Sequence, residues 1–259
     1  MATSSIEWTE ATWNPVTGCT RASAGCDHCY AVFLTRRLAR MGQEKYKGLV
    51  NPGKNHFNGV VKIHPETLEM PLRWKKRRTI FVNSMSDLFH PGVPTAFILK
   101  VFEVMKKAHW HKFQVLTKRP ERAAELDAVI EWPPNVWMGT SVEDDRVLHR
   151  VDHLRRTSAH VRFLSLEPLI GPLPDLNLDG MHWVIVGGES GWKARPMEEA
   201  WVRDILRQCR EKDVRFFFKQ LGSVWARRMG TRDNKGSNWH DLPPALRVRD
   251  YPEETALLA

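Results

Sequence analysis

Residues 79–117 read TIFVNSMSDLFHPGVPTAFILKVFEVMKKAHWHKFQVLT and contain two apolar runs separated by a helical pattern. The first run, Thr79–Asn83, and the second, Phe113–Thr117, have the length and the β-branched or aromatic content of buried strands. Between them, the segment Thr95–Ala108 carries apolar residues at positions 97, 98, 101, 102, 104 and 105, which is helical spacing. A strand, a helix and a second strand predict a βαβ unit, in which the two strands run parallel.

The same alternation continues along most of the chain, with strand starts about 20 to 35 residues apart. Further strands are expected at 59–63, 136–140, 161–166, 183–186 and 214–218, and further helices at 28–41, 66–75, 120–130, 143–156 and 198–212. Seven strands, or eight if the segment before Cys19 is extended, predict an α/β fold. We expect a complete or slightly irregular parallel (β/α) barrel of TIM type over residues 1–222, with an N-terminal three-cysteine loop at 13–30. An open doubly wound sheet usually has a glycine-rich loop after its first strand, where this chain has cysteines.

The C-terminal segment, the net charge and the absence of long apolar runs indicate the kind of partner and the compartment to expect. Residues 223–259 are polar and basic, and we expect them to form an extension packed on or near the barrel. The formal net charge of +9 favours a polyanionic partner such as DNA or RNA, although charge that serves only solubility is an equal alternative. The sequence has no apolar run long enough for a membrane span and no basic and apolar leader, so we expect a cytoplasmic protein.

Three of the four cysteines, Cys19, Cys26 and Cys29, fall within eleven residues with the spacing C-x6-C-x2-C, and Cys209 lies far away. Clustered cysteines in a reducing compartment are more often metal ligands than disulfides. Three interpretations stay open at this point. They are a zinc site that needs a fourth ligand, a redox pair of Cys26 and Cys29, and a [4Fe–4S] cluster held by three thiolates with one iron free for another ligand.

Polar residues follow almost every expected strand, and in a parallel barrel the carboxyl ends of the strands form the working face. Glycines at 187 and 188 would let a backbone approach a ligand, and carboxylates there would bind amines or ribose hydroxyls. Asp87 and the nearby His90 could form an acid–base pair, with helix capping as the alternative role for Asp87. The strand-end residues that we select as candidates are Asn83, Asp87, Lys118, Arg119, Ser141, Glu143, Glu167, Gly187, Gly188, Glu189, Lys219 and Gln220.

Several motifs in combination resemble the phage Gp37/Gp68 family, a group of three-cysteine proteins. They are Trp13-Asn-Pro-Val-Thr-Gly-Cys19, Cys26-Asp-His-Cys29-Tyr30-Ala31, Phe81-Val-Asn-Ser-Met-Ser-Asp87-Leu-Phe, Leu116-Thr-Lys-Arg-Pro120, Leu166-Glu-Pro168 and Gly187-Gly-Glu-Ser190. The match covers most of residues 5–222. That family is distantly similar to the spore photoproduct lyase branch of the radical S-adenosylmethionine (SAM) superfamily. In that superfamily the commoner spacing is C-x3-C-x2-C, and here the first gap is six residues.

This resemblance implies a barrel that carries a [4Fe–4S] cluster on Cys19, Cys26 and Cys29 and that binds SAM. Under that hypothesis the strand-end residues Asn83, Ser141, Gly187, Gly188 and Glu189 are the candidates to hold SAM. Catalytic roles are expected for Asp87, Lys118, Glu143 and Glu167, and contacts to an anionic substrate, a nucleotide or nucleic acid, for Lys118, Arg119, Lys219 and Gln220. The expected partners are an external electron donor and a protein of the three-Cys-motif partner family.

A second hypothesis comes from another functional class. The chain would then be a basic nucleic-acid-binding module whose cysteines hold structural zinc or a non-catalytic cluster. A metal-assisted hydrolase built on Asp87, His90, Glu143 and Glu167 is a weaker alternative, because these residues lack a specific ligand spacing.

Overall fold

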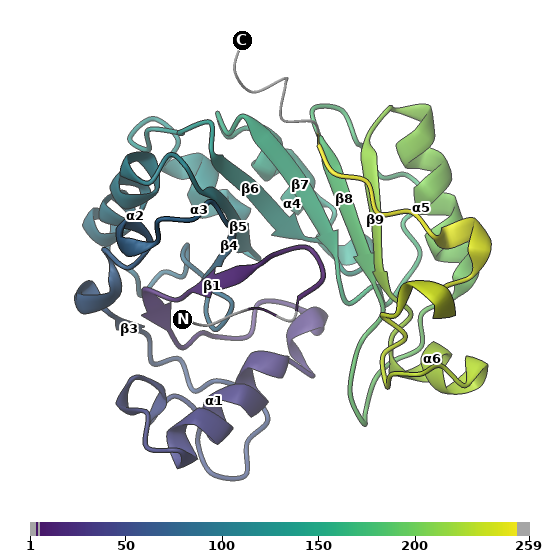
Figure 1. Cartoon of the computed structure of the whole chain (residues 1–259), viewed down its shortest axis with the longest axis horizontal. Coiled ribbons are helices and arrows are strands. Elements are labelled where there is room, and N and C mark those ends of the chain that lie inside the picture. The colour runs from purple at the N-terminus through teal and green to yellow at the C-terminus, as the bar shows by residue number, and fades with distance from the viewer. Residues whose placement is uncertain (1–3, 5, 253–259) are drawn as a thin grey trace.

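The computed structural model describes residue 4 and residues 6–252 and has one curled sheet of seven parallel strands at its centre (Figure 1). The strands lie in the order in which they occur along the chain. They are β1 (Ala11–Trp13), β4 (Thr79–Val82), β5 (Lys112–Thr117), β6 (Val136–Ser141), β7 (Val161–Leu166), β8 (Trp183–Gly187) and β9 (Arg215–Gln220). The βαβ rhythm of the sequence and the parallel α/β fold are therefore confirmed.

The sheet is a half-barrel rather than the complete barrel that the sequence predicts. Strands β1 and β9 are its two edges, and no ladder joins them within residues 6–252. The edge of β9 is used by the C-terminal extension instead. The Phe218 amide donates to Val248 O at 2.8 Å, and the Asp250 amide donates to Phe216 O at 2.9 Å. An extension that pairs antiparallel with the last strand takes the hydrogen-bonding groups that closure would need.

The segment expected to form a strand at 59–63 lies outside this sheet. Only β3 (Lys62–Ile63) forms there, and it pairs antiparallel with β2 (Val16–Thr17). The seventh strand is β1, the extended segment before Cys19, whose Trp13 lies opposite Val82 of β4. Six strands of the sheet lie where they were expected, and with the segment before Cys19 extended the prediction was eight strands, so the expected sheet strand at 59–63 is wrong.

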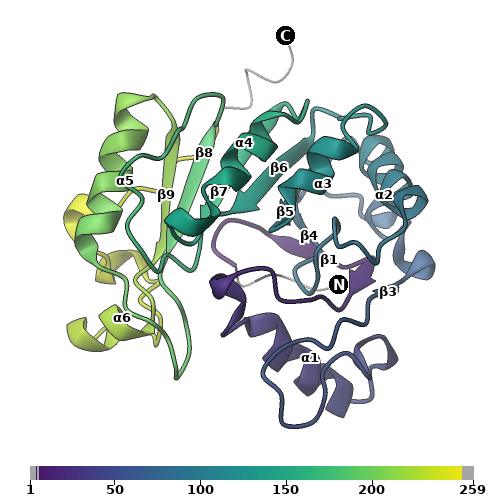
Figure 2. The same ribbon diagram turned by 180° about the vertical axis from the view of Figure 1, so that it is seen from behind.

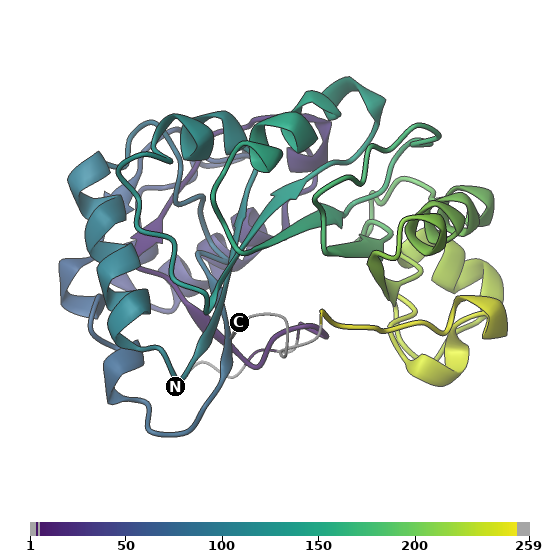
Figure 3. The ribbon, with the colours of Figure 1, turned by 90° about the horizontal axis from the view of Figure 1, so that it is seen from above.

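Helices cover the outer, convex face of the sheet (Figures 2 and 3). They are α2 (Thr95–Lys107), α3 (Pro120–Glu125), α4 (His149–Arg155) and α5 (Glu199–Glu211). The helix expected at 66–75 is instead two 3-10 turns, Pro65–Thr67 and Pro71–Arg73, because a proline inside an α-helix removes a donor and clashes with the preceding turn. None of the helices among the described residues has the length and apolar character of a membrane span.

Two further helices, α1 (Tyr30–Arg40) and α6 (Ser223–Met229), lie beyond the end of the sheet to which strands β8 and β9 point (Figure 1). The first follows the cysteine loop directly, and the second opens the C-terminal extension. No helix was expected at 223–229. The remaining short 3-10 turns are Ala24–Cys26, Glu44–Tyr46, Asp145–Val147, Trp239–Asp241 and Pro244–Leu246.

The two faces of the sheet are apolar in different ways. Outward residues such as Val82 and Met138 join the large mixed core of aliphatic and aromatic side chains beneath the helices. Inward residues such as Phe81 and Phe163 form an aromatic cluster with Trp8, whose ring centroid lies 4.8 Å from that of Phe81 and 6.4 Å from that of Phe163. Because successive side chains of a strand alternate, residues two and four positions further along the inner face reach the carboxyl end of the sheet, where they become polar.

Candidate functional site: a three-cysteine cavity at the carboxyl end of the sheet

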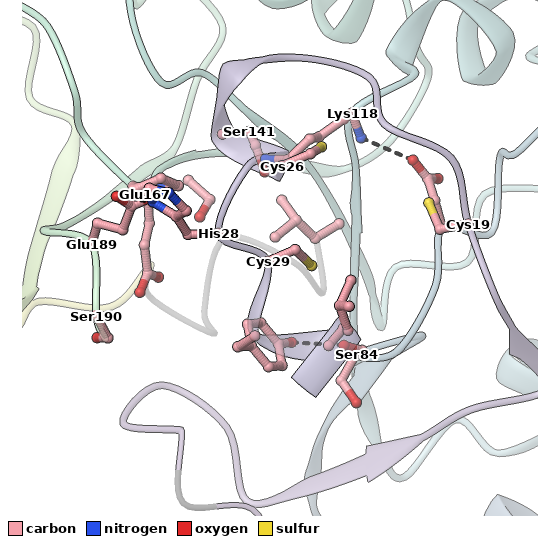
Figure 4. Close-up of a pocket in the computed structure, with 18 of the residues that line it drawn as sticks. Cys19, Cys26, His28, Cys29, Ser84, Lys118, Ser141, Glu167, Glu189 and Ser190 are labelled. Atoms are coloured by element: carbon pink, nitrogen blue, oxygen red, sulfur yellow. Dashed lines mark hydrogen bonds and ion pairs between the residues drawn. The ribbon is translucent and has the colours of Figure 1, made fainter. Parts of the chain in front are cut away.

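A cavity of about 420 Å³ opens at the carboxyl ends of the strands, and all three clustered cysteines line it (Figure 4). Its size is in the range of small-molecule and cofactor sites. Of the candidates selected from sequence, Glu143 and Gly187 do not line it. Those that do are Cys19, Cys26, Cys29, Asn83, Asp87, Lys118, Arg119, Ser141, Glu167, Gly188, Glu189, Lys219 and Gln220.

Strand alternation explains why an aromatic floor is joined to a polar rim. On β6 and β7 the inner face passes from Gly139 to Ser141 and from Phe163 to Ser165, and these residues are paired across the two strands. A Cβ at Gly139 would lie 2.4 Å from the Phe163 ring, so a glycine is needed to seat that ring. Small serines follow where a ligand would need room.

The cysteine loop joins a 3-10 turn, Ala24–Cys26, to α1, and Cys29 stands at the N-cap position of that helix. Cys19, Cys26 and Cys29 are all free thiols and partly exposed. Burial, with the nearby Asp87 carboxylate, raises the pKa of Cys19 to about 12, and burial raises the pKa of Cys29. A bound metal would therefore have to displace protons from these thiols, as metal binding to cysteine generally does.

Glu143, just after β6, connects the cysteine loop to the end of that strand. Its carboxylate is buried, accepts from Ser23 Oγ at 2.8 Å and pairs with Lys118 at 2.6 Å and Arg150 at 3.1 Å. Burial alone would raise its pKa, but the two cations hold the pKa below its ordinary value. A Cβ at Gly25 would lie 2.4 Å from this side chain, so the loop packs directly on it. The expected catalytic role of Glu143 finds no support in this placement, which points to a holding role.

Asp87 makes a second attachment through Arg119. Its carboxylate accepts from Thr117 Oγ1 at 2.6 Å and from Arg119 Nη1 at 2.8 Å, as well as from the backbone amides of residues 89 and 118. The guanidinium in turn donates to Thr20 O at 3.1 Å and lies 3.8 Å from Cys19 Sγ. Asp87 thus holds the cation that contacts the first cysteine segment.

The expected acid–base pair of Asp87 and His90 is not formed. His90 Nε2 lies 2.9 Å from Thr20 Oγ1, and its Nδ1 accepts the backbone N–H of Gly92 at 3.0 Å. With Nδ1 acting as an acceptor, Nε2 carries the proton and donates it to the threonine. His90 therefore supports the same cysteine segment as Arg119 does.

Glu189 makes the third attachment, at the end of β8. It accepts from Arg195 Nη2 at 2.6 Å and Nε at 3.0 Å, and its Oε2 lies 2.9 Å from His28 Nδ1. Arg195 also donates to Ala24 O at 2.9 Å. Arg195 and His28 were not selected from the sequence as members of the site. The one available signal for Arg195 is its position six residues after a strand-end glutamate.

On the opposite part of the rim, a glutamate and a lysine are paired with each other rather than with the cysteine loop. Glu167 accepts from Lys219 Nζ at 2.6 and 2.8 Å, and this pair faces the cavity. Asn83 adopts a positive φ of 60° and is 2% exposed. Its Oδ1 accepts from the Val16 amide at 3.3 Å, but its Nδ2 has no hydrogen-bond partner among the described residues. A buried amide donor without a partner in the protein is costly, and a ligand acceptor would satisfy it.

The two glycines after β8 have a structural reason to be glycines. A Cβ on Gly188 would lie 2.3 Å from Leu221 O, and one on Gly187 would lie 3.3 Å from the side chains of Gln220 and Glu167. Close approach of a ligand was the expected reason, and close approach of the chain's own backbone is what the structure has at Gly188. Gln220 Nε2 donates to Gly188 O at 2.8 Å and to Ser190 Oγ at 2.7 Å, so the Gln220 amide also stabilises the turn after β8.

The three clustered cysteines line one cavity, so their placement is compatible with a shared iron–sulfur cluster. Within the described part of the chain, no three His, Cys, Asp or Glu side chains are gathered so that they could hold one metal ion. An iron–sulfur cluster spreads its thiolate ligands over separate iron atoms, so a cluster site requires its cysteines to face a common space. The three thiols do so, and the fourth cysteine, Cys209, is buried on α5 and does not line this cavity.

Comparison with known proteins gives a family for this chain. No curated protein and no solved structure matches it. The resemblance to phage Gp37/Gp68 proteins and to radical SAM proteins stays a prediction from the motifs. A family model described as "Protein of unknown function (DUF5131)" matches residues 3–243, and the chain belongs to that family.

Proposed function

We propose that this protein is an iron–sulfur enzyme of radical SAM type. Cys19, Cys26 and Cys29 would hold a [4Fe–4S] cluster, and the adjoining cavity would bind SAM at the iron without a cysteine. The observation that carries the proposal is the meeting of three free thiols in one cavity at the carboxyl end of a parallel sheet. When bound, such a cluster supplies the electron that cleaves SAM reductively and begins radical chemistry.

The cavity suits a ligand that carries both charges. SAM has a carboxylate, an ammonium and a sulfonium on one side and an adenosine on the other. Lys219 and Glu167 face the cavity as a pair that can exchange partners with the amino-acid part of SAM, and Asn83 offers its unpartnered amide. Apolar side chains of Phe81 and Leu116 line the same space and would pack against the adenosine.

The three attachments from the strand ends give the loop a fixed position. Asp87, Glu143 and Glu189 act through buried or half-buried ion pairs that reach residues 20–28. Their task would be to position the cysteines and to keep the cavity closed to water from the loop side. Geometry held in advance in this way is what reactive sites require.

The substrate is proposed to be anionic, a nucleotide or nucleic acid, on the basis of the formal charge of +9. The cavity itself contributes little free positive charge to this. Lys118 and Arg119, which we expected to hold the substrate, are each paired with a carboxylate of the chain. We therefore place the anionic part of the substrate on the basic surface and its reacting part at the cavity.

The test is anaerobic reconstitution with iron and sulfide, followed by iron analysis, absorbance and electron paramagnetic resonance. We expect about four irons per chain, a broad band near ~400 nm, and a signal from the reduced protein that SAM perturbs. Alanine variants of Cys19, Cys26 and Cys29 should each lose the band, and Cys209→Ala should keep it. A colourless protein with one zinc would overturn the proposal in favour of the nucleic-acid-binding module.

A further inference from the structure

Helix α1 presents an exposed stripe of large apolar side chains. Phe33 and Leu34 on the helix and Met41 at its C-cap are 57%, 38% and 65% exposed, and Tyr30, 55% exposed, lines the three-cysteine cavity. Their spacing of three, four and eleven residues from Tyr30 places them along one side of the helix. Surface apolar residues are usually scattered, and a contiguous group of this kind marks an interaction surface.

The opposite side of the helix is already in use. Ala31, Val32 and Thr35 are buried, and the first two belong to a cluster that also contains Tyr46 and Leu49. The helix cannot rotate to hide the exposed stripe without giving up this packing. The stripe is therefore a fixed feature of the surface, and its helix α1 lies in the lower part of the molecule in Figure 1.

The charged residues of α1 are all arginines. Arg36, Arg37 and Arg40 carry three positive charges, and the helix has no Asp or Glu. Helical spacing places Arg37 within the apolar stripe itself. Aromatic residues, methionine and arginine are enriched in protein–protein interfaces, and lysine and acidic residues are depleted there. The composition of this face is that of a protein interface whose partner is acidic.

Other occupants fit less well. A second copy of the chain docked two-fold on this face would bring arginines against arginines. Nucleic acid would use the arginines but would gain nothing from Leu34 and Met41, because phosphates bind cations and bases stack on aromatic or guanidinium planes.

We propose that the α1 face, defined as Phe33, Leu34, Arg37, Arg40 and Met41, docks a small acidic electron-carrying protein. This rests on the function proposed above. The helix begins immediately after Cys29, so a carrier seated on it would lie beside the proposed cluster. One electron would pass from the reduced carrier to the oxidised cluster, which leaves the carrier oxidised by one electron and the cluster reduced by one, with no bond made or broken.

The first experiment measures binding, with a flavodoxin as the acidic probe and the protein as isolated. We expect Arg37→Glu/Arg40→Glu to raise the dissociation constant tenfold or more. Phe33→Gln/Met41→Gln should raise it by a similar factor without a change of charge. The control is Lys75→Glu/Lys76→Glu, which makes the same charge change on an exposed segment just before β4, at the opposite end of the sheet. It should bind like the wild type. Absence of binding by the wild type, or equal binding by all variants, would overturn the proposal.

The second experiment measures cluster reduction in reconstituted protein by the reduced flavodoxin and, separately, by dithionite. We expect the α1 variants to be reduced at least tenfold more slowly by flavodoxin and at the wild-type rate by dithionite. If dithionite reduces no iron in any variant, the proposed function fails, while the binding result still decides the docking face. If the α1 variants instead lose affinity for a single-stranded oligonucleotide or for anionic lipid vesicles, with flavodoxin binding unchanged, the partner assignment is wrong.

Discussion

Carboxylates and cations have different roles on the two sides of the cavity. On one side, here called the clamp side, Asp87, Glu143 and Glu189 are each paired with cations and attach the cysteine loop to the sheet. On the open side, Glu167 pairs with Lys219 across the cavity wall, and Asn83 keeps a buried donor without a partner among the described residues. The difference teaches that a carboxylate at a strand end can be a structural part of a site without touching its ligand. The clamp side should govern stability, and the open side should govern ligand affinity.

The strongest test of the clamp side is Glu143→Gln. Glu143 is 1% exposed, and its loss leaves Lys118 and Arg150 without their shared carboxylate. We expect the free energy of unfolding to fall by about 3 kcal/mol, the lower end for breaking a buried ion pair on one side. Urea denaturation measures this. The matched control is Glu131→Gln, which breaks an exposed pair with Lys106 and should change stability by no more than about 0.5 kcal/mol. Equal effects of the two variants would remove the distinction between clamp and surface pairs.

The stability difference between the wild type and Glu143→Gln should also depend on pH. Burial alone would raise the pKa of Glu143, but Lys118 and Arg150 hold it below the ordinary value of 4.5. A carboxylate with a lowered pKa stabilises the fold fully above its unfolded pKa and loses this contribution as the pH falls through its folded pKa. The stability gap between the wild type and Glu143→Gln should therefore be constant from pH 7 to about pH 5 and should shrink below pH 4.5. A gap that widens on acidification would contradict the assigned direction.

Much of the architecture was predictable, because it follows from local patterns. The apolar runs at 79–83 and 113–117 and the helical spacing at 95–108 become β4, β5 and α2 almost without shift. Barrel closure was not predictable in this way. It depends on whether β9 pairs with β1 or with the extension near Val248, and both are long-range pairings with no local signal.

The membership of the site was predictable and the division of labour within it was not. Polar residues at strand ends converge because parallel strands share one carboxyl edge, which placed most of the chosen residues around one cavity. Whether Glu143 or Glu167 meets a ligand depends on which cation lies beside each of them. Glu143 is paired with Lys118, from the end of β5, and with Arg150, seven residues further along, whereas Glu167 is paired with Lys219, 52 residues away on β9. Only the fold shows which of these cations lies beside which carboxylate.

On the open side we expect the reverse signature from the double variant Glu167→Gln/Lys219→Met. Both partners of the pair are removed together, so no unpaired charge remains, and stability should change by about 1 kcal/mol or less. Affinity for SAM should fall about tenfold or more, since a hydrogen bond to a charged group contributes about 1.5 to 3 kcal/mol. Calorimetric titration of the reconstituted protein measures this. Unchanged SAM affinity beside a large loss of stability would move this pair to the clamp side.

The smallest expected change in stability, and so the finest test of the open side, is Asn83→Gly. The variant loses the 3.3 Å hydrogen bond that the Val16 amide donates to Asn83 Oδ1, and the Nδ2 group has no hydrogen-bond partner among the described residues to lose. Glycine adopts the positive φ of 60° without strain, which offsets this loss. We expect stability to stay within about 0.5 kcal/mol of the wild type while SAM affinity falls about five- to tenfold. Asn83→Ala removes the same amide but keeps a Cβ at that φ, so it should lose the same affinity and be ~1 kcal/mol less stable than Asn83→Gly. If both variants keep full affinity, the unpartnered amide does not serve a ligand, and its burial is a cost of the sharp turn after β4.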